Sequence, residues 1–353
     1  MRRVTTSYNN KPVLYTIHTM SSNHKTTDRR TNQRDSRPNN NKRGERIVDV
    51  KKLRDGTKKA GPMMESLCRA FWERKPFING TSSNVNNELE VKFNTPRYHN
   101  PKNGPDTTPY VPPLTRNDYD NVISKLQSLG FSTVNDAGAY MLRIQPEFLD
   151  SRNGTYALSK VRVEIRGFAA IQEYCVHNDI NKILDAPIYS RAISMHKKSD
   201  AKHPTTGAKL SSANFMDFHF KVSYSTEEEY SLVSRFGIAK STVDSWQKSK
   251  KAFRYINRVT FTHPDYPVKV DISIVKSAGM RPDTRAYTTS EAGVFLADEA
   301  YEVEVEVDNS MIGIGTPTEN VETLIVNLRK CIKYVLMGIQ ETSYPVPVSD
   351  QLG

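Results

Sequence analysis

Acidic residues and valines alternate along Tyr301-Glu302-Val303-Glu304-Val305-Glu306-Val307. Successive side chains of a β-strand point to opposite faces, so the pattern predicts a strand with a glutamate face and a valine face. A distant segment, Glu88-Leu89-Glu90-Val91-Lys92-Phe93, repeats this design. The valine face suits a packed core, whereas neighbouring carboxylates repel one another. A positive group is therefore expected beside the acids, most simply a divalent metal ion with oxygen ligands.

Other segments alternate in the same way but present mainly cations on the polar face. In 160–166, Lys160, Arg162, Glu164 and Arg166 oppose Val161, Val163 and Ile165. Three more strands are predicted with polar faces of this kind. They are 216–224 with Asp217, His219 and Lys221, 253–262 with Arg254 and Arg258, and 267–276 with Lys269, Asp271 and Ser273.

The remaining pattern predicts helices, short strands and loops. Apolar residues at helical spacing predict helices over 62–75, 115–129 and 318–340, and a further helix or turn over 169–178. The segment 241–251 is expected to be a short helix, and 140–144 and 156–158 short strands. Segments 95–113 and 194–214 are rich in polar residues, Pro or Gly and are expected to be loops.

Two architectures account for so many strands with one charged face. One is a sheet whose polar face lies in bulk solvent, and the other is a small closed barrel with a charged lumen. A solvent face usually mixes Thr, Ser, Lys and Gln, whereas here two strands present acids and the others mainly Lys and Arg. A lumen with acids on one wall and cations on another can bind a metal–triphosphate, because the acids hold the metal and the cations neutralise the phosphates.

Composition adds a basic N-terminus to this picture. The net charge is +11, and residues 1–46 carry eleven Lys and Arg against three Asp and Glu. We expect a disordered tail there, which either keeps the protein soluble or tethers RNA. Three widely spaced cysteines indicate neither a zinc site nor a disulfide framework and favour a reducing, intracellular compartment. The chain contains no apolar run of about 18 residues, so no membrane span is expected. The N-terminus lacks the apolar core of a secretory signal.

The paired acidic segments, Glu88 to Phe93 and Glu302 to Glu306, resemble the signature of the triphosphate tunnel metalloenzymes. The likeness is strongest to the RNA triphosphatase module of mRNA-capping enzymes from large DNA viruses, and it covers roughly residues 62–340. Two further stretches support that branch. They are Arg162-Val163-Glu164-Ile165-Arg166-Gly167 and Phe253-Arg254-Tyr255-Ile256-Asn257-Arg258.

The resemblance implies an α+β fold, built as a closed eight-stranded antiparallel β-barrel with flanking helices. It also implies a polynucleotide 5′-phosphatase that uses Mg²⁺ or Mn²⁺ to remove the γ-phosphate from 5′-triphosphate RNA, the first step of cap formation. Glu88, Glu90, Glu304 and Glu306 would hold the metal, and Glu302 would orient a water. Phosphate contacts would come from Lys92, Arg162, Arg166, Lys221, Arg258 and Lys269, with Lys221 and Arg258 also assisting catalysis. Asp271 would hold a neighbouring Lys or Arg by a salt bridge. His219 is more simply a structural residue.

Three interpretations of function stay open at this point. The first is the RNA triphosphatase, and the second is a tunnel enzyme for inorganic triphosphate, polyphosphate or nucleoside triphosphates. The third is an inactive RNA-binding subunit. The expected organisation is a basic tail over 1–60, the tunnel domain over 61–341 and a linker over 342–353. The chain lacks the Lys-x-Asp-Gly motif of a guanylyltransferase, so such a domain or subunit is an expected partner, in the host cytoplasm or the virion if the protein is viral.

Overall fold

The structure is a computed structural model that describes residues 50–74, 85–94, 112–134, 139–152, 154–232 and 237–343. Most of the predicted tail, loop 95–113 and linker lie outside the described residues. The strands have the following bounds: β1 Val85–Phe93, β2 Ser132–Thr133, β3 Tyr140–Asp150, β4 Thr155–Leu158, β5 Val161–Arg166, β6 Ile193–Asp200, β7 Ala213–Phe215, β8 Phe220–Tyr230, β9 Lys251–His263, β10 Tyr266–Ala278 and β11 Glu299–Val307. The helices are α1 Val50–Glu73, α2 Arg116–Ser128, α3 Phe168–His177, α4 Ile180–Asp185, α5 Gly237–Ser245, α6 Thr289–Ala292 and α7 Val321–Ser343, with 3₁₀ turns η2 Trp246–Lys248, η3 Pro282–Thr284, η4 Val294–Leu296 and η5 Asn309–Met311.

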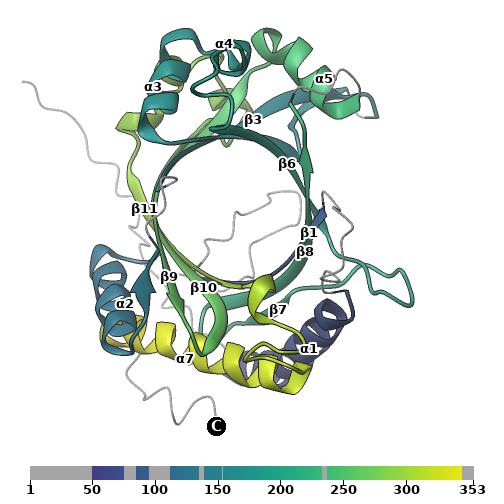
Figure 1. The fold of residues 1–353 in the computed structure, drawn as a ribbon, viewed down its shortest axis with the longest axis vertical. Coiled ribbons are helices and arrows are strands. Elements are labelled where there is room, and N and C mark those ends of the chain that lie inside the picture. Colours follow the sequence, from purple (N-terminus) through teal and green to yellow (C-terminus); the bar gives the residue numbers. More distant parts are fainter. Residues whose placement is uncertain are drawn as a thin grey trace, which may run out of the picture. The chain divides into compact units, whose positions relative to one another are not determined.

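Eight antiparallel strands close into a barrel, which confirms the predicted fold. Their order around the wall is β9-β10-β11-β1-β8-β6-β5-β3, and β3 pairs back with β9. The view along the barrel in Figure 1 shows the ring of strands, and the short strands β2, β4 and β7 add to its edges. Closure removes free strand edges and turns one face of every strand inward.

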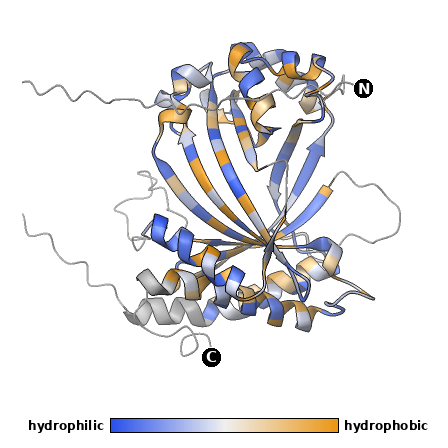
Figure 2. Cartoon of the chain, turned by 60° about the vertical axis from the view of Figure 1, so that its left-hand side comes forward, coloured by the Kyte–Doolittle hydropathy of each residue, from blue (hydrophilic) through white to orange (hydrophobic). Residues whose placement is uncertain are grey.

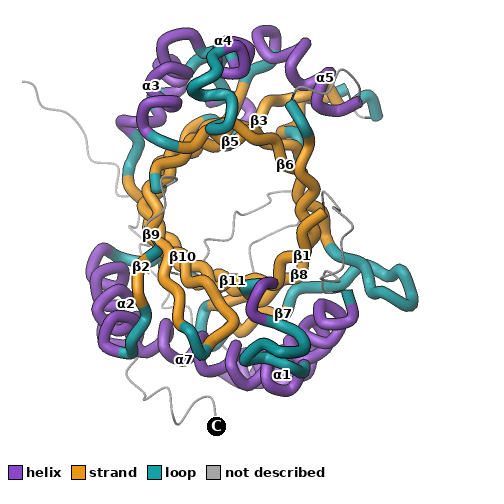
Figure 3. The backbone as a smooth tube through the Cα atoms, in the orientation of Figure 1, coloured by secondary structure: helices purple, strands orange, loops and turns teal. Residues whose placement is uncertain are grey.

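Helices cover two opposite sides of the barrel (Figures 1 and 3). On one side, α1, α2 and α7 pack on the valine face of β11 and the apolar face of β1, in a core that includes Val303, Val305 and Leu89. On the other side, α3, α4 and α5 cover β3, β5 and β6. Since the apolar residues pack outward beneath helices, the charged residues of the same strands face the lumen.

The helix α7 has the apolar stripe that its sequence predicts, including the buried Leu324, Leu328 and Val335. It packs closely on α2, where a Cβ on Gly338 would meet the Val122 Cα atom at 2.8 Å. The predicted start of α2 is also present, because the Asp118 N–H donates to the Thr115 hydroxyl at 3.2 Å and forms a capping box.

Three sequence-based predictions of elements are wrong. The first helix begins at Val50 rather than at residue 62. The segment 194–214 is only partly a loop, because Ile193–Asp200 forms β6 and Ala213–Phe215 forms β7. Residues 216–219, including His219, form a turn, and β8 begins only at Phe220. The strand β6 escaped the prediction because its inward side chains are polar and only Ile193 and Met195 mark the buried face.

Every helix among the described residues is too short or too polar to cross a membrane.

Candidate functional site

The two acidic segments lie side by side in the barrel wall. β1 and β11 pair antiparallel, with Glu90 opposite Glu306 and Lys92 opposite Glu304. On the other side of β11, Asp271 of β10 lies opposite Glu304. The acids therefore form a continuous patch on three neighbouring strands of the lumen. We call this patch, made of Glu88, Glu90, Asp271, Glu304 and Glu306, the acidic wall.

Two lysines lie among these carboxylates. Lys198 of β6 reaches Glu88 at 2.8 Å and Glu90 at 2.9 Å. Lys92 donates to Glu304 at 2.7 Å and lies 3.2 Å from Glu90. The lysines keep the pKa of Glu90 below its ordinary value against the opposing effect of burial, and Lys92 and Arg258 do the same for Glu304. These three carboxylates therefore already have positive partners.

Glu306 lacks such a partner among the described residues. Burial in the lumen, with Glu88, Asp271 and Glu90 nearby, raises the pKa of Glu306 to about 8. The pKa of Glu88 is also raised, mainly by burial, although Lys198 opposes the shift. The acidic wall therefore carries more negative charge than its lysines balance around Glu306.

This imbalance tests whether a divalent ion suits the acidic wall. All the donors are carboxylate oxygens, which hard cations such as Mg²⁺ and Mn²⁺ prefer, and the crowded Glu306 indicates a shortage of positive charge. Within the described residues, no three Asp, Glu, His or Cys side chains stand converged as ion ligands, and Lys92 and Lys198 lie among the glutamates instead. The chemistry of the donors fits such an ion, provided that the lysines share or yield the oxygens.

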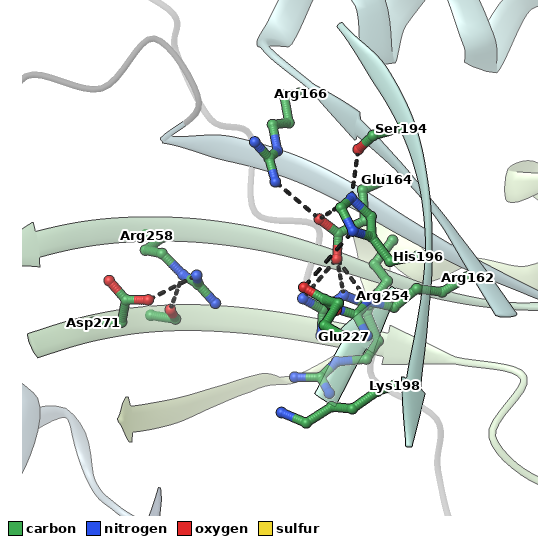
Figure 4. A network of polar contacts seen from close by, with 12 residues as sticks. Arg162, Glu164, Arg166, Ser194, His196, Lys198, Glu227, Arg254, Arg258 and Asp271 are labelled. Carbon is green, nitrogen blue, oxygen red and sulfur yellow. Dashed lines mark hydrogen bonds and ion pairs between the residues drawn. The ribbon is translucent and has the colours of Figure 1, made fainter. Parts of the chain in front are cut away.

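The opposite part of the lumen is built around one buried carboxylate, Glu164 of β5 (Figure 4). It accepts from Arg143 of β3 at 2.9 Å and from Arg162 at 2.8 Å. Arg166 lies 3.3 Å away and His196 3.9 Å away. Although burial opposes it, the two closest guanidinium groups lower the pKa of Glu164 far below its ordinary value. We call this group of Glu164, Arg143, Arg162, Arg166 and His196 the arginine cluster.

Glu227 of β8 is a second acid at this cluster, in contact with Arg162 and 3.7 Å from His196. Burial and the charges of Arg162, Arg254 and Arg258 nevertheless lower the pKa of Arg143. A further anion nearby would stabilise the charged form of such a guanidinium group. The arginine cluster thus has a cationic excess that a phosphate group can satisfy.

Two arginines of β9 form further ion pairs with acids of the lumen. Arg254 of β9 donates to both oxygens of Glu302, at 2.8 and 2.7 Å. Arg258 lies 2.7 Å from Asp271, whose other oxygen accepts from the Thr260 hydroxyl at 2.6 Å. Asp271, expected to hold a neighbouring cation, has Arg258 as that neighbour, while Glu302 is held by Arg254.

The other cations of the sequence-based site lie farther out or make different contacts. Lys221 lies opposite Lys92 on β8 and is partly buried. Lys269 is exposed and pairs with Asp308 at 3.4 Å. Arg166 ends β5 with 51% of its side chain exposed. His219 lies in the turn before β8.

Several lumen residues were not predicted from the sequence, above all Lys198, Arg143, His196 and Glu227. Arg143 stands in an alternating segment, between the buried Leu142 and Ile144. Lys198 and His196 were not predicted as site residues because the segment that forms β6 was expected to be a loop. Glu227 lies beyond the part of β8 that the alternation marked. Arg254 was noted beside Arg258 but was not assigned to the site.

Comparisons with known proteins give little beyond this geometry. No protein-family model matches the chain, and no curated protein is significantly similar to it. Among solved structures, the Pct1 RNA triphosphatase of S. pombe aligns with 84% of this chain and 89% of its own, at 13% identity and a TM-score of 0.32. The same enzyme in complex with the Spt5 CTD aligns with 80% and 91%, at 12% identity and a TM-score of 0.33. Such scores are too low to assign a family, so fold and function rest on the residues of this chain.

Proposed function

We propose that this protein is a divalent-metal-dependent hydrolase that removes the γ-phosphate from the 5′-triphosphate end of RNA. Water adds to the γ-phosphorus and the bond to the oxygen bridging the β- and γ-phosphates breaks. The products are orthophosphate and a 5′-diphosphate end. The observation that carries the proposal is the lumen itself, in which an acidic wall short of positive charge faces an arginine cluster with cations in excess.

In this proposal Glu88, Glu90, Glu304 and Glu306 hold the ion, which when bound neutralises charge on the phosphate oxygens and polarises the phosphoryl group. Lys92 and Lys198 exchange carboxylate oxygens for phosphate oxygens. Arg258, with Arg143 and Arg162, binds the triphosphate and stabilises the charge that develops in the transition state, as does Lys221 from its place opposite Lys92. Glu302, held by Arg254, orients the attacking water and accepts its proton.

The predicted phosphate contacts of Arg166 and Lys269 belong at the rim rather than in the centre, because both side chains are exposed. There they meet the part of the substrate that leaves the lumen.

The test is phosphate release from triphosphate-ended RNA with Mg²⁺ or Mn²⁺. Glu90→Ala and Glu304→Ala are each expected to lower the rate by about a hundredfold or more, the usual scale for losing a group that stabilises the transition state. Glu228→Ala is the matched control, because Glu228 follows Glu227 on β8 and points away from the lumen. Wild-type activity in both lumen variants would refute the assignment of the acidic wall.

The same assay separates the other interpretations. Faster release from tripolyphosphate or nucleoside triphosphates than from RNA would favour the small-substrate enzyme. No divalent-dependent release from any triphosphate would favour an inactive RNA-binding subunit.

We also propose a place for the protein in mRNA capping, beside a guanylyltransferase domain or subunit that uses its 5′-diphosphate product. The sequence resemblance described above supports the viral branch of such enzymes, and with it action in the host cytoplasm or the virion.

A further inference from the structure

The outer wall of the barrel carries a stripe of aromatic rings that the lumen chemistry does not use. Tyr140 of β3 and Tyr255 of β9 stack with centroids 6.2 Å apart and planes 21° apart. Phe168 of α3 meets Tyr140 at 6.0 Å, and Phe295 of η4 meets Tyr255 at 5.1 Å. We call Phe168, Tyr140, Tyr255 and Phe295 the aromatic stripe.

This stripe is open to solvent. Phe168 is 54%, Tyr140 39% and Phe295 37% exposed, and Tyr255 is partly exposed. In Figure 2 no helix among the described residues lies over the outer face of the strands between the two helical layers. Aromatic rings gathered in this way on a surface mark a binding site more often than scattered apolar residues do.

The stripe begins at the rim of the lumen. Arg166 is the last residue of β5, and its guanidinium group reaches Glu164 inside the barrel. Two residues later, Phe168 lies on the outside, and the intervening Gly167 N–H donates to the Tyr140 carbonyl at 2.8 Å. This hydrogen bond holds the inner cation and the first two rings of the stripe at one point of the rim.

The far end of the stripe has its own cation and a hollow. Lys276 donates to the Phe295 carbonyl at 3.3 Å and is 3.7 Å from Glu299. A surface hollow of about 400 Å³ opens at the same η4 turn and is lined by Leu296, Ser277 and Arg281 among others. A path of rings therefore runs from Arg166 at the rim to a hollow on the outer wall, where Arg281 pairs with Asp283 at 3.9 Å.

We propose that the aromatic stripe binds the single-stranded RNA that follows the 5′-triphosphate, by stacking its first bases on Phe168 and Tyr140. This inference rests on the proposed function for the position of the triphosphate. Exposed rings with cations at their margins are the arrangement with which proteins hold single strands without reading sequence, because every base has a π-face. The stripe then makes RNA a better substrate than a free nucleoside triphosphate, which has no following bases to stack.

The test uses substitutions that separate stacking from apolar contact. Phe168→Leu and Tyr140→Leu keep an apolar side chain but remove the ring, whereas Phe168→Tyr and Tyr140→Phe keep the ring. Phe148→Leu is the matched control, because Phe148 is 45% exposed and lies in β3 near the β3–β4 turn, outside the stripe. None of these residues touches the acidic wall or the arginine cluster in the contacts described above.

Binding is measured first, by fluorescence anisotropy with a 3′-labelled RNA of about 12 nucleotides that ends in a 5′-hydroxyl. Each leucine variant of the stripe is expected to bind roughly 5- to 150-fold more weakly, the range for one lost stacking partner. The ring-keeping variants and Phe148→Leu are expected to bind like the wild type. Because this RNA has no triphosphate, the measurement does not depend on hydrolysis.

Kinetics provide the second measurement. The leucine variants are expected to raise KM for triphosphate-ended RNA by a similar factor and to leave KM for ATP unchanged. Unaltered binding of the hydroxyl-ended RNA by both leucine variants would overturn the inference and leave the stripe to a protein partner. If the wild type hydrolyses no triphosphate while ring-dependent RNA binding persists, the proposed function fails and the stripe stands as an RNA site.

Discussion

Two glutamates of one lumen have opposite electrostatic surroundings. Glu164 is buried beneath Arg143 and Arg162, and their charges lower its pKa despite its burial. Glu306 is partly buried with Glu88, Asp271 and Glu90 near it, and its pKa rises to about 8. Both alternate with apolar residues in their strands, so the difference comes from the neighbours that the barrel supplies.

Positive and negative charges are therefore concentrated in different parts of the lumen instead of balancing one another locally. Around Glu164 the cations exceed the acids, which suits an incoming anion, and around Glu306 the acids exceed the cations, which suits an incoming cation. A metal–triphosphate carries both kinds of charge. Substitution of charged residues around Glu164 and around Glu306 therefore tests whether the two glutamates have opposite electrostatic surroundings.

Removal of the Glu164 carboxylate is expected to have the largest effect on stability. Glu164→Ala leaves Arg143 and Arg162 buried without their shared partner, so the free energy of unfolding should fall by about 3–5 kcal/mol. Urea denaturation measures this loss. Glu228→Ala, on the outer face of β8, should change it far less, and a loss below about 1 kcal/mol for Glu164→Ala contradicts the central role of this carboxylate.

Glu306→Gln is expected to stabilise the metal-free protein at alkaline pH. Since the pKa of Glu306 is raised from about 4.5 to about 8 on folding, its ionisation costs stability progressively as pH rises through this window, and the full cost applies above it. After discounting for solvent in the lumen, the variant should gain about 1–3 kcal/mol at pH 9 and nothing at pH 4.

Denaturation in EDTA at both pH values measures this difference. Glu302→Gln is the control, because Glu302 is paired with Arg254 and its loss should destabilise rather than stabilise. Equal stability of Glu306→Gln and wild type at pH 9 would show that the crowding of carboxylates has no energetic consequence.

Lys198→Met tests the role of a cation in the acidic wall. It removes the ammonium group between Glu88 and Glu90, so the protein in EDTA should lose roughly 1–2 kcal/mol. Because the two carboxylates then have one competitor fewer, Mn²⁺ should raise the unfolding temperature of this variant more than that of the wild type. Calorimetry with and without Mn²⁺ measures both changes, and an equal or smaller response of the variant to Mn²⁺ argues against an ion at these oxygens.

Arg166→Gln should have the smallest effect on stability. Its side chain is half exposed, so the pair with Glu164 at 3.3 Å contributes about 1 kcal/mol or less. Arg143→Gln provides the contrast, because Arg143 donates to the same carboxylate from a more buried position. Urea denaturation measures the free energy of unfolding of both variants. Similar decreases would mean that burial does not determine how much each arginine of the cluster contributes to stability.

The alternation of side chains was enough to predict most of the barrel. Six of its eight strands contain a segment predicted from this alternation, β3 was predicted only as the short strand 140–144, and β6 was not predicted. The acidic wall was found in the same way, since all four of its glutamates stand in the segment 301–307 or its upstream counterpart 88–93. By contrast β6, with the site residues His196 and Lys198, was missed because polar lumen residues give a strand the composition of a loop.

For the strands that were predicted, the sequence alone showed which face is apolar and that the opposite face is charged. The side-chain period of a strand is a local property of the backbone, so neighbouring residues suffice to reveal it. Only the tertiary structure decided which charges meet. Register and closure bring Glu90 beside Glu306, Lys198 between Glu88 and Glu90, and Arg143 onto Glu164, and these pairings span residues far apart in the chain. A pKa depends on all charges within a few ångströms. The sequence therefore identified Glu164 and Glu306 but could not show that their pKa values shift in opposite directions.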